Sequence, residues 1–283
     1  MNEDGPMLRV PSTDGVVVAV HDLGGEGEPF LVCHATGFLG RVYEPLAAAL
    51  TGRFHVYALD FRGHGDATVP DNGRFDWRAM GDDLEAVIDA LDVAPVRVFG
   101  HSMGGGVSLL VEQRRPGTIR SAYLFEPIVP PAVEGTALQG PSGMSEAARK
   151  RRPVFASKAE ALYRYASRPP LHELRADSLY AYVEHGFRER PDGTVELKCA
   201  PESEAATFDA PGKPTVDLLH EVMAPVTIAI GTTAHDWTPA HFGTAVADAL
   251  PNGRLEQHPA LGHFGPMQDP VTIGQRIIAA VHA

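Results

Sequence analysis

The chain has 283 residues, of which 44% are hydrophobic and 21% are charged, close to the averages for globular proteins. Its 24 Lys and Arg residues against 36 Asp and Glu residues give a net charge of −12, which disfavours binding to nucleic acid or to an anionic membrane surface. Two cysteines, Cys33 and Cys199, are too few for a disulfide framework or a four-sulfur zinc site.

Short apolar runs alternate with amphipathic helical patterns along most of the chain. Strands are expected at residues 15–21, 30–33, 54–60, 96–100, 121–125, 226–231 and 254–258. Helices are expected at residues 41–50, 76–91, 104–113, 239–250 and 271–281. Strands that alternate with helices imply parallel pairing and right-handed crossovers. The sequence therefore predicts an α/β fold, with a mostly parallel central sheet covered by helices on both faces.

The alternation is interrupted between residues 127 and 223. Pro127, Pro130 and Pro131 break the chain, and helical patterns then recur without strong strands between them. We expect residues 1–126 and 224–283 to form one α/β core, and residues 127–223 to form a mainly helical insertion. Its aromatic residues either pack the insertion or line a pocket: Phe155, Tyr163, Tyr165, Tyr180, Tyr182 and Phe187.

A serine lies at the junction between a predicted strand and a predicted helix. Residues 100–104, Gly-His-Ser-Met-Gly, match the pattern G-x-S-x-G. A tight strand-to-helix turn holds such a serine in strained backbone geometry and needs small neighbours at Gly100 and Gly104. The turn would place Ser102 at the carboxyl end of the sheet, where open α/β sheets bind ligands. We therefore interpret Ser102 as a candidate nucleophile.

A serine nucleophile needs a base that is oriented by an acid. Asp236 follows the predicted strand 226–231, and His263 lies in a glycine-flanked loop after the strand 254–258. Both residues therefore fall at the same rim of the sheet as Ser102. The chain order Ser, Asp, His is the order expected for a nucleophile-elbow hydrolase. We expect Ser102, Asp236 and His263 to form a catalytic triad.

These stretches resemble the α/β-hydrolase superfamily over nearly the whole chain outside the insertion. The matching segments are residues 34–38 (HATGF), 60–65 (DFRGHG), 100–105, Asp236 and 262–264 (GHF). The resemblance implies that the N–H groups of Thr36 and Met103 form an oxyanion hole, and that the insertion is a cap over the site. The sequence departs from the family pattern at Ala35, where glycine is usual. Glu126 ends a strand at which some members of the superfamily carry their acid, so it is an alternative to Asp236.

The sequence carries no metal-binding or nucleotide-binding pattern. H-E-x-x-H and paired C-x-x-C motifs are absent, as are a P-loop and a G-x-G-x-x-G after a strand, so we expect no metal and no cofactor. The basic run at residues 149–152 is either a solvated helix face or a site for an anionic group of a substrate. The segment MNEDGPMLRV lacks the apolar stretch of a secretory signal, and no stretch reaches the ~18 apolar residues of a membrane helix. We expect a cytoplasmic protein.

The sequence favours a serine hydrolase that cleaves a small-molecule carboxylic ester or lactone through an acyl-enzyme on Ser102. Serine at the elbow disfavours the chemistry of related epoxide hydrolases and haloalkane dehalogenases, which use aspartate there. Two alternatives stay open: hydrolysis of a carbon–carbon bond in a vinylogous diketone on the same triad, and a ligand receptor or non-catalytic member of the fold. The oligomeric state is open as well.

Overall fold

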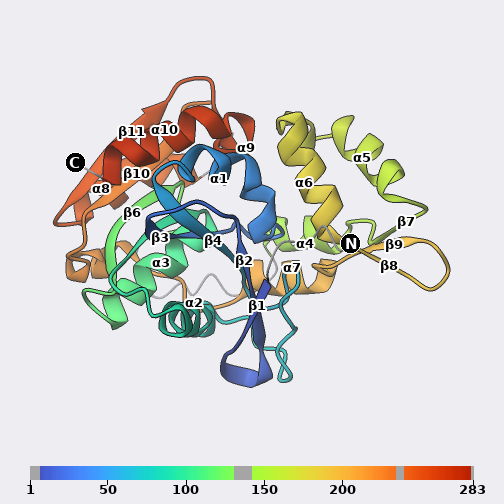
Figure 1. Cartoon of the computed structure of the whole chain (residues 1–283), viewed down its shortest axis with the longest axis horizontal. Coiled ribbons are helices and arrows are strands. Elements are labelled where there is room, and N and C mark those ends of the chain that lie inside the picture. Colours follow the sequence, from blue (N-terminus) through green and yellow to red (C-terminus); the bar gives the residue numbers. More distant parts are fainter. Residues whose placement is uncertain (1–6, 131–141, 234–238, 282–283) are drawn as a thin grey trace.

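The computed structural model describes residues 7–130, 142–233 and 239–281. An eight-stranded sheet forms its centre, with the strand order β1-β2-β4-β3-β5-β6-β10-β11 (Figure 1). The strands are β1 (Met7–Pro11), β2 (Val17–Asp22), β3 (Glu28–Cys33), β4 (Phe54–Asp60), β5 (Val96–His101), β6 (Ile119–Phe125), β10 (Val226–Gly231) and β11 (Gly253–His258). The pairs from β4 to β11 are parallel, whereas β1 pairs antiparallel with β2 and β2 pairs antiparallel with β4. This confirms the predicted α/β class with a mostly parallel sheet.

Helices cover both faces of the sheet and bury two hydrophobic clusters against it. The core helices are α1 (Glu44–Leu50), α2 (Trp77–Leu91), α3 (Met103–Arg114), α8 (Gly243–Ala249), α9 (Gly265–Gln268) and α10 (Pro270–Val281). Short 3-10 helices adjoin them: η1 (Thr13–Gly15), η2 (Gly40–Tyr43), η4 (Val216–Glu221) and η5 (Pro239–Phe242). Side chains of α2, α3 and α8 belong to one cluster, and side chains of α1 and α10 belong to the other.

The segment between β6 and β10 contains helices and a small second sheet. Its elements are α4 (Gly143–Arg149), β7 (Val154–Phe155), α5 (Lys158–Ala166), η3 (Leu171–Glu173), α6 (Ala176–Gly186), β8 (Phe187–Glu189), β9 (Val195–Leu197) and α7 (Pro201–Asp209). Figure 1 shows α5, α6 and the β8–β9 hairpin on the right, beside the α/β body. The division of the chain into a core and an insertion of residues 127–223 stays a prediction. The antiparallel sheet β7-β9-β8 was not expected, because strands of two or three residues are too short to show alternation.

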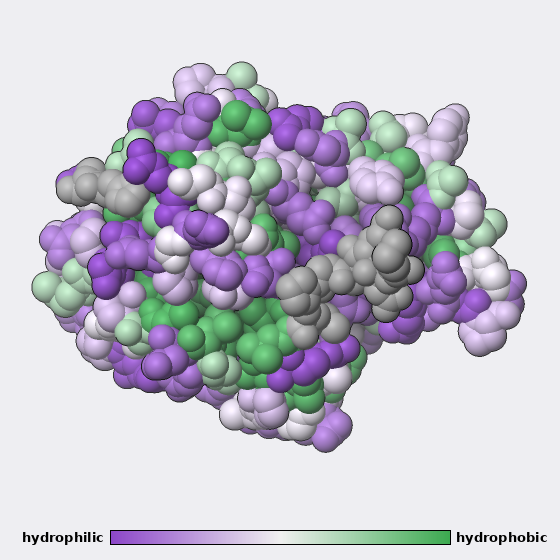
Figure 2. Space-filling view, viewed as in Figure 1, coloured by the Kyte–Doolittle hydropathy of each residue, from purple (hydrophilic) through white to green (hydrophobic). Residues whose placement is uncertain are grey.

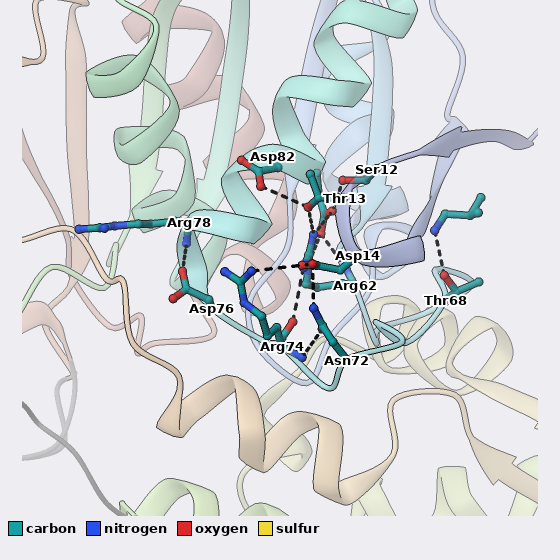
Figure 3. Close-up of polar contacts among 12 residues, drawn as sticks. Ser12, Thr13, Asp14, Arg62, Thr68, Asn72, Arg74, Asp76, Arg78 and Asp82 are labelled. Atoms are coloured by element: carbon teal, nitrogen blue, oxygen red, sulfur yellow. Dashed lines mark hydrogen bonds and ion pairs between the residues drawn. The ribbon is translucent and has the colours of Figure 1, made fainter.

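Arg62, in the turn after β4, fixes that turn to the body of the fold. Its guanidinium is fully buried and donates from Nε and Nη2 to the two carboxylate oxygens of Asp83 in α2, each at 2.8 Å. Nη1 donates to Asp14 at 2.9 Å, and Nη2 donates to Thr13 at 3.0 Å (Figure 3). A buried charge is tolerated only when it is paired and hydrogen-bonded in this way. Arg62 of the D-F-R-G-H-G motif therefore braces the turn after β4.

Hydrophilic residues cover most of the face shown in Figure 2, and hydrophobic residues gather in the lower part of the α/β body. The longest helix within the described ranges, α2, has 15 residues. None of the helices in those ranges is long and apolar enough to cross a membrane.

Candidate active site

Ser102 lies between β5 and α3 in a strained backbone conformation. Its φ of 52° and ψ of −111° are rare for a residue with a side chain and cost about 1–3 kcal/mol. The turn is held from both sides, because the Ser102 N–H donates to the carbonyl of Phe125 at 3.0 Å and its own carbonyl accepts from Ile128 at 3.1 Å. The predicted strand–turn–helix context of Ser102 is present.

The two glycines of the motif let the backbone approach closely at this turn. A Cβ on Gly104 would lie 2.2 Å from the carbonyl oxygen of Cys33, and a Cβ on Gly100 would lie 2.7 Å from the Cα of Gly105. Both distances are far below van der Waals contact, so a side chain at either position would push α3 away from the sheet. Gly104 also donates its N–H to the carbonyl of His34 at 3.1 Å, which ties the start of α3 to the end of β3.

His263 and Glu126 meet at the carboxyl end of the sheet. The Nδ1 atom of His263 lies 2.7 Å from Oε2 of Glu126, and the other carboxylate oxygen accepts the Gly231 N–H at 3.0 Å. The Glu126 side chain is 1% exposed, so its carboxylate is shielded from water. Glu126 also takes a positive φ of 43°, a strained conformation that aims its side chain from the end of β6. The alternative acid of the sequence is thus placed against the candidate base.

Asp236, the acid favoured by the sequence, lies outside the described residues. The strand before it, β10, ends at Gly231 as predicted, beside the carboxylate of Glu126. The assignment of Asp236 to the triad therefore stays a prediction.

Thr36, in the segment after β3, lines the same cavity as Ser102. Thr36 and Met103 are both buried, and neither of their N–H groups donates to an acceptor within the described part of the chain. The carbonyl of Ala35 accepts from His34 Nδ1 at 2.8 Å, which fixes the peptide that carries the Thr36 N–H. Ala35 has no positive φ, so the methyl group fits where glycine is usual in the superfamily. The role of these two N–H groups as an oxyanion hole stays a prediction.

The His34 ring has one defined tautomer. Its Nε2 accepts the Phe61 N–H at 3.0 Å, so Nδ1 must carry the proton that it donates to Ala35. Burial lowers the pKa of His34 to about 3, which keeps the ring neutral at physiological pH. His34 thus braces the loop after β3 against Phe61.

His101 and Tyr43 connect this loop to the His263 loop, a link that the sequence did not reveal. The Tyr43 hydroxyl accepts the Ala35 N–H at 3.3 Å and lies 2.7 Å from His101 Nδ1. The carbonyl of His263 lies 2.8 Å from His101 Nε2 and can only accept, so Nε2 carries the proton and Nδ1 accepts from Tyr43. Burial, and then the nearby His263, lower the pKa of His101 well below its usual value. Only the position of His101 beside the serine hinted at this role.

Ser102, His263 and Thr36 line one cavity of about 370 Å³, within the range of small-molecule sites. Phe38 and Phe264 of the core contribute to its wall. The segment between β6 and β10 supplies most of the remaining wall, including Met144, Ala147, Ala148, Lys150, Arg151, Arg152, Phe155, Arg164, Tyr165, Arg168, Leu171, Tyr182, Glu204 and Phe208. Of the aromatic residues named in the sequence analysis, Phe155, Tyr165 and Tyr182 line the cavity. Tyr163 and Tyr180 are exposed, and Phe187 is buried.

One group of side chains has the composition of a metal site. His21, Asp60 and Asp66 offer ligand atoms within 4.8 Å of one another. The Asp60 carboxylate is already engaged by His21 at 2.9 Å, by the Gly40 N–H at 2.6 Å and by the Asp66 N–H at 2.8 Å. These hydrogen bonds connect the loops after β3 and β4, so the cluster has a structural role without a metal.

The sheet order, the strained serine after β5 and the cavity at the carboxyl ends of the strands define an α/β hydrolase. The chain belongs to the alpha/beta hydrolase family, whose pattern matches residues 30–273. A relative from Mycobacterium tuberculosis, named "Putative non-heme bromoperoxidase BpoC", is 28% identical, and the match covers 91% of this chain and 95% of the relative.

Two solved structures illustrate the shared fold. E-2-(acetamidomethylene)succinate hydrolase superposes with a TM-score of 0.77 at 22% identity, covering 98% of this chain and all of that one. A thermophilic esterase from Thermogutta terrifontis gives a TM-score of 0.74 at 22% identity, covering 99% of this chain and all of that one. At this identity the likeness concerns the fold.

Proposed function

We propose that this protein is a serine hydrolase that cleaves a carboxylic ester or lactone through an acyl-enzyme on Ser102. The observation that carries the proposal is the strained Ser102 in one cavity with His263, whose ring is held by the Glu126 carboxylate at 2.7 Å. Strain is retained where the surrounding structure fixes it, and such positions cluster at active sites. The family and the cavity are consistent with this chemistry, which requires no cofactor.

In the proposed reaction, Ser102 Oγ attacks the carbonyl carbon while His263 Nε2 takes its proton. The N–H groups of Thr36 and Met103 donate hydrogen bonds to the tetrahedral oxyanion. In sites of this type each such hydrogen bond stabilises the transition state by roughly 3 kcal/mol. His263 then protonates the leaving alcohol, and the carbonyl reforms as an acyl-enzyme. Water, deprotonated by His263, attacks the acyl carbon and releases the acid.

The acid in this scheme orients the His263 ring and stabilises the imidazolium. We assign this role to Glu126, because its carboxylate lies 2.7 Å from His263 Nδ1. Asp236, the acid favoured by the sequence, stays the other candidate. We further propose that the insertion of residues 127–223 acts as a cap, because it supplies most of the cavity wall.

The test is steady-state turnover of p-nitrophenyl esters with acyl chains of increasing length. The proposal predicts many turnovers per enzyme for the wild type and a loss of at least 10³-fold in kcat for Ser102→Ala. Ser121→Ala is a matched control, since Ser121 is a buried serine in β6 whose hydroxyl has no hydrogen-bond partner within the described part of the chain. Equal activity of the wild type and Ser102→Ala would refute the proposal.

The same assay separates the alternatives that the sequence left open. Turnover of a vinylogous 1,5-diketone with little turnover of simple esters would identify a carbon–carbon hydrolase. A single slow turnover followed by tight retention of product would identify a receptor. Neither alternative has an observation in the structure that favours it over ester hydrolysis.

A further inference from the structure

The cavity wall is strongly cationic on the side that the insertion supplies. Among the described residues, one carboxylate, that of Glu204, lines the cavity. Five basic side chains of the described residues line it as well: Lys150, Arg151, Arg152, Arg164 and Arg168. The protein as a whole carries a net charge of −12, so this concentration of positive charge runs against the composition of the chain. A cleft lined by charge of one sign attracts ligands of the opposite sign.

Two of the five cations are already compensated within the protein. Arg151 forms an ion pair with Glu204 and a hydrogen bond of 2.5 Å to the Tyr182 hydroxyl, which in turn donates to the carbonyl of Gly37 at 3.4 Å. Arg152 pairs with Glu160 at 2.8 Å. These two residues therefore hold the insertion together and connect it to the loop after β3.

The other three cations have no such partner. Within the ranges that the structure describes, no carboxylate oxygen lies within 4.0 Å of Lys150, Arg164 or Arg168. Lys150 follows the end of α4, and Arg164 and Arg168 lie in and just after the last turn of α5. Arg164 interacts electrostatically with Glu160, four residues earlier in the same helix, but Glu160 forms its ion pair with Arg152.

We propose, on the basis of the proposed function, that the substrate is an ester that carries a second, ionised carboxylate, and that Lys150, Arg164 and Arg168 bind this carboxylate. Guanidinium groups suit the role because their planar donors match a carboxylate geometrically. The rest of the wall includes apolar side chains such as Phe38 and Phe155. A substrate with an apolar segment beside the ester and the charged group would suit this lining.

The experiment compares kcat/KM for matched charged and neutral esters. One pair places the carboxylate on the acyl part: mono-4-nitrophenyl adipate and its methyl ester. The other pair places it on the leaving group: 4-acetoxybenzoate and methyl 4-acetoxybenzoate. At low ionic strength, at least one pair is expected to show a roughly tenfold preference for the charged ester, because an ionised carboxylate accepts stronger hydrogen bonds from cationic side chains than a neutral ester does. Raising the salt concentration is expected to reduce that preference.

Variants assign the effect to the proposed residues. The double variant Arg164→Gln and Arg168→Gln is expected to lower the charged-to-neutral ratio roughly tenfold. Arg188→Gln is the control: it removes one positive charge from the same insertion, but Arg188 lies in β8, outside the cavity wall, and pairs with Glu196. This control is expected to leave the ratio unchanged. Circular dichroism melting curves confirm that each variant is folded.

The outcomes separate the two proposals. If neither charged nor neutral esters are turned over, the proposed function fails. If both pairs show equal turnover of charged and neutral esters, the enzyme is an esterase but the carboxylate site is refuted. A preference that persists in the double variant, or that Arg188→Gln abolishes equally, would also overturn the assignment to Arg164 and Arg168.

Discussion

Replacing Glu126 with glutamine tests which acid orients His263. In the wild type, the two oxygens of Glu126 accept two different protons, from His263 Nδ1 at 2.7 Å and from the Gly231 N–H at 3.0 Å. Glutamine has almost the same shape but offers one acceptor and one donor in place of the two acceptors. One of the two bonds must therefore change.

The histidine ring is the partner that can adapt. If the glutamine oxygen stays on the Gly231 N–H, its amide faces His263 Nδ1, and the ring must move its proton to Nε2. In that tautomer, His263 cannot accept the proton of Ser102. The reverse orientation sets two buried donors against each other and costs about 1–3 kcal/mol. We expect kcat to fall roughly 10³- to 10⁴-fold, as when the oriented tautomer of a triad is lost.

Steady-state hydrolysis of p-nitrophenyl acetate measures the effect, with Asp236→Asn assayed in parallel. The account predicts a large loss of kcat in Glu126→Gln, a similar KM, and a free energy of unfolding in urea within about 3 kcal/mol of the wild type. Near-full activity in Glu126→Gln together with a large loss in Asp236→Asn would refute this reasoning and support the acid favoured by the sequence.

Three further predictions concern the framework of the site. Tyr43→Phe leaves His101 Nδ1 and the Ala35 N–H without their hydrogen-bond partner. The free energy of unfolding in urea should therefore fall by about 1–3 kcal/mol, and ester assays should show a lower kcat. An unchanged kcat and an unchanged stability would contradict the link. Gly104→Ala should reduce stability by about 1–3 kcal/mol or more in thermal melts, because its Cβ would meet the carbonyl oxygen of Cys33. Gly143→Ala is the control, since Gly143 has open space around it and the variant should not be destabilised. Equal melting temperatures of the two variants would contradict the close approach of Gly104 to Cys33. Burial keeps the pKa of His34 and of His101 below the usual value of 6.5. Below pH 6.5 the unfolded state therefore binds more protons than the folded state, and the free energy of unfolding should fall by about 1.4 kcal/mol per pH unit for each ring. Equal melting temperatures at pH 7.5 and pH 5.5 would contradict this.

Local patterns in the sequence predict the elements that carry the site. The strand Phe54–Asp60 is observed with the predicted bounds, and the helix predicted from residue 76 begins at Trp77, with Asp76 as its N-cap. The elbow at Ser102 follows from two glycines that permit a close approach. These features depend on residues near one another in the chain, so their pattern is visible without the fold.

Other features depend on contacts between distant segments. The edge strand β1 (Met7–Pro11) was not predicted, because its pairing with β2 is what makes it a strand. The placement of Glu126 against His263 depends on the order of β6, β10 and β11 in the sheet and on a positive φ at a strand end. The basic run 149–152 was read as either a solvated face or an anion site, and only the fold shows that part of it lines the cavity.

Labelling with a fluorophosphonate probe, followed by intact mass measurement, tests the central claim most directly. The probe reacts with a serine whose hydroxyl is activated by a neighbouring base, so it reports the assembled site without knowledge of the substrate. The account predicts a single adduct on the wild type and on Ser121→Ala, and none on Ser102→Ala. An unmodified wild type that is well folded, or an adduct that persists in Ser102→Ala, would contradict the assignment of Ser102 as the nucleophile.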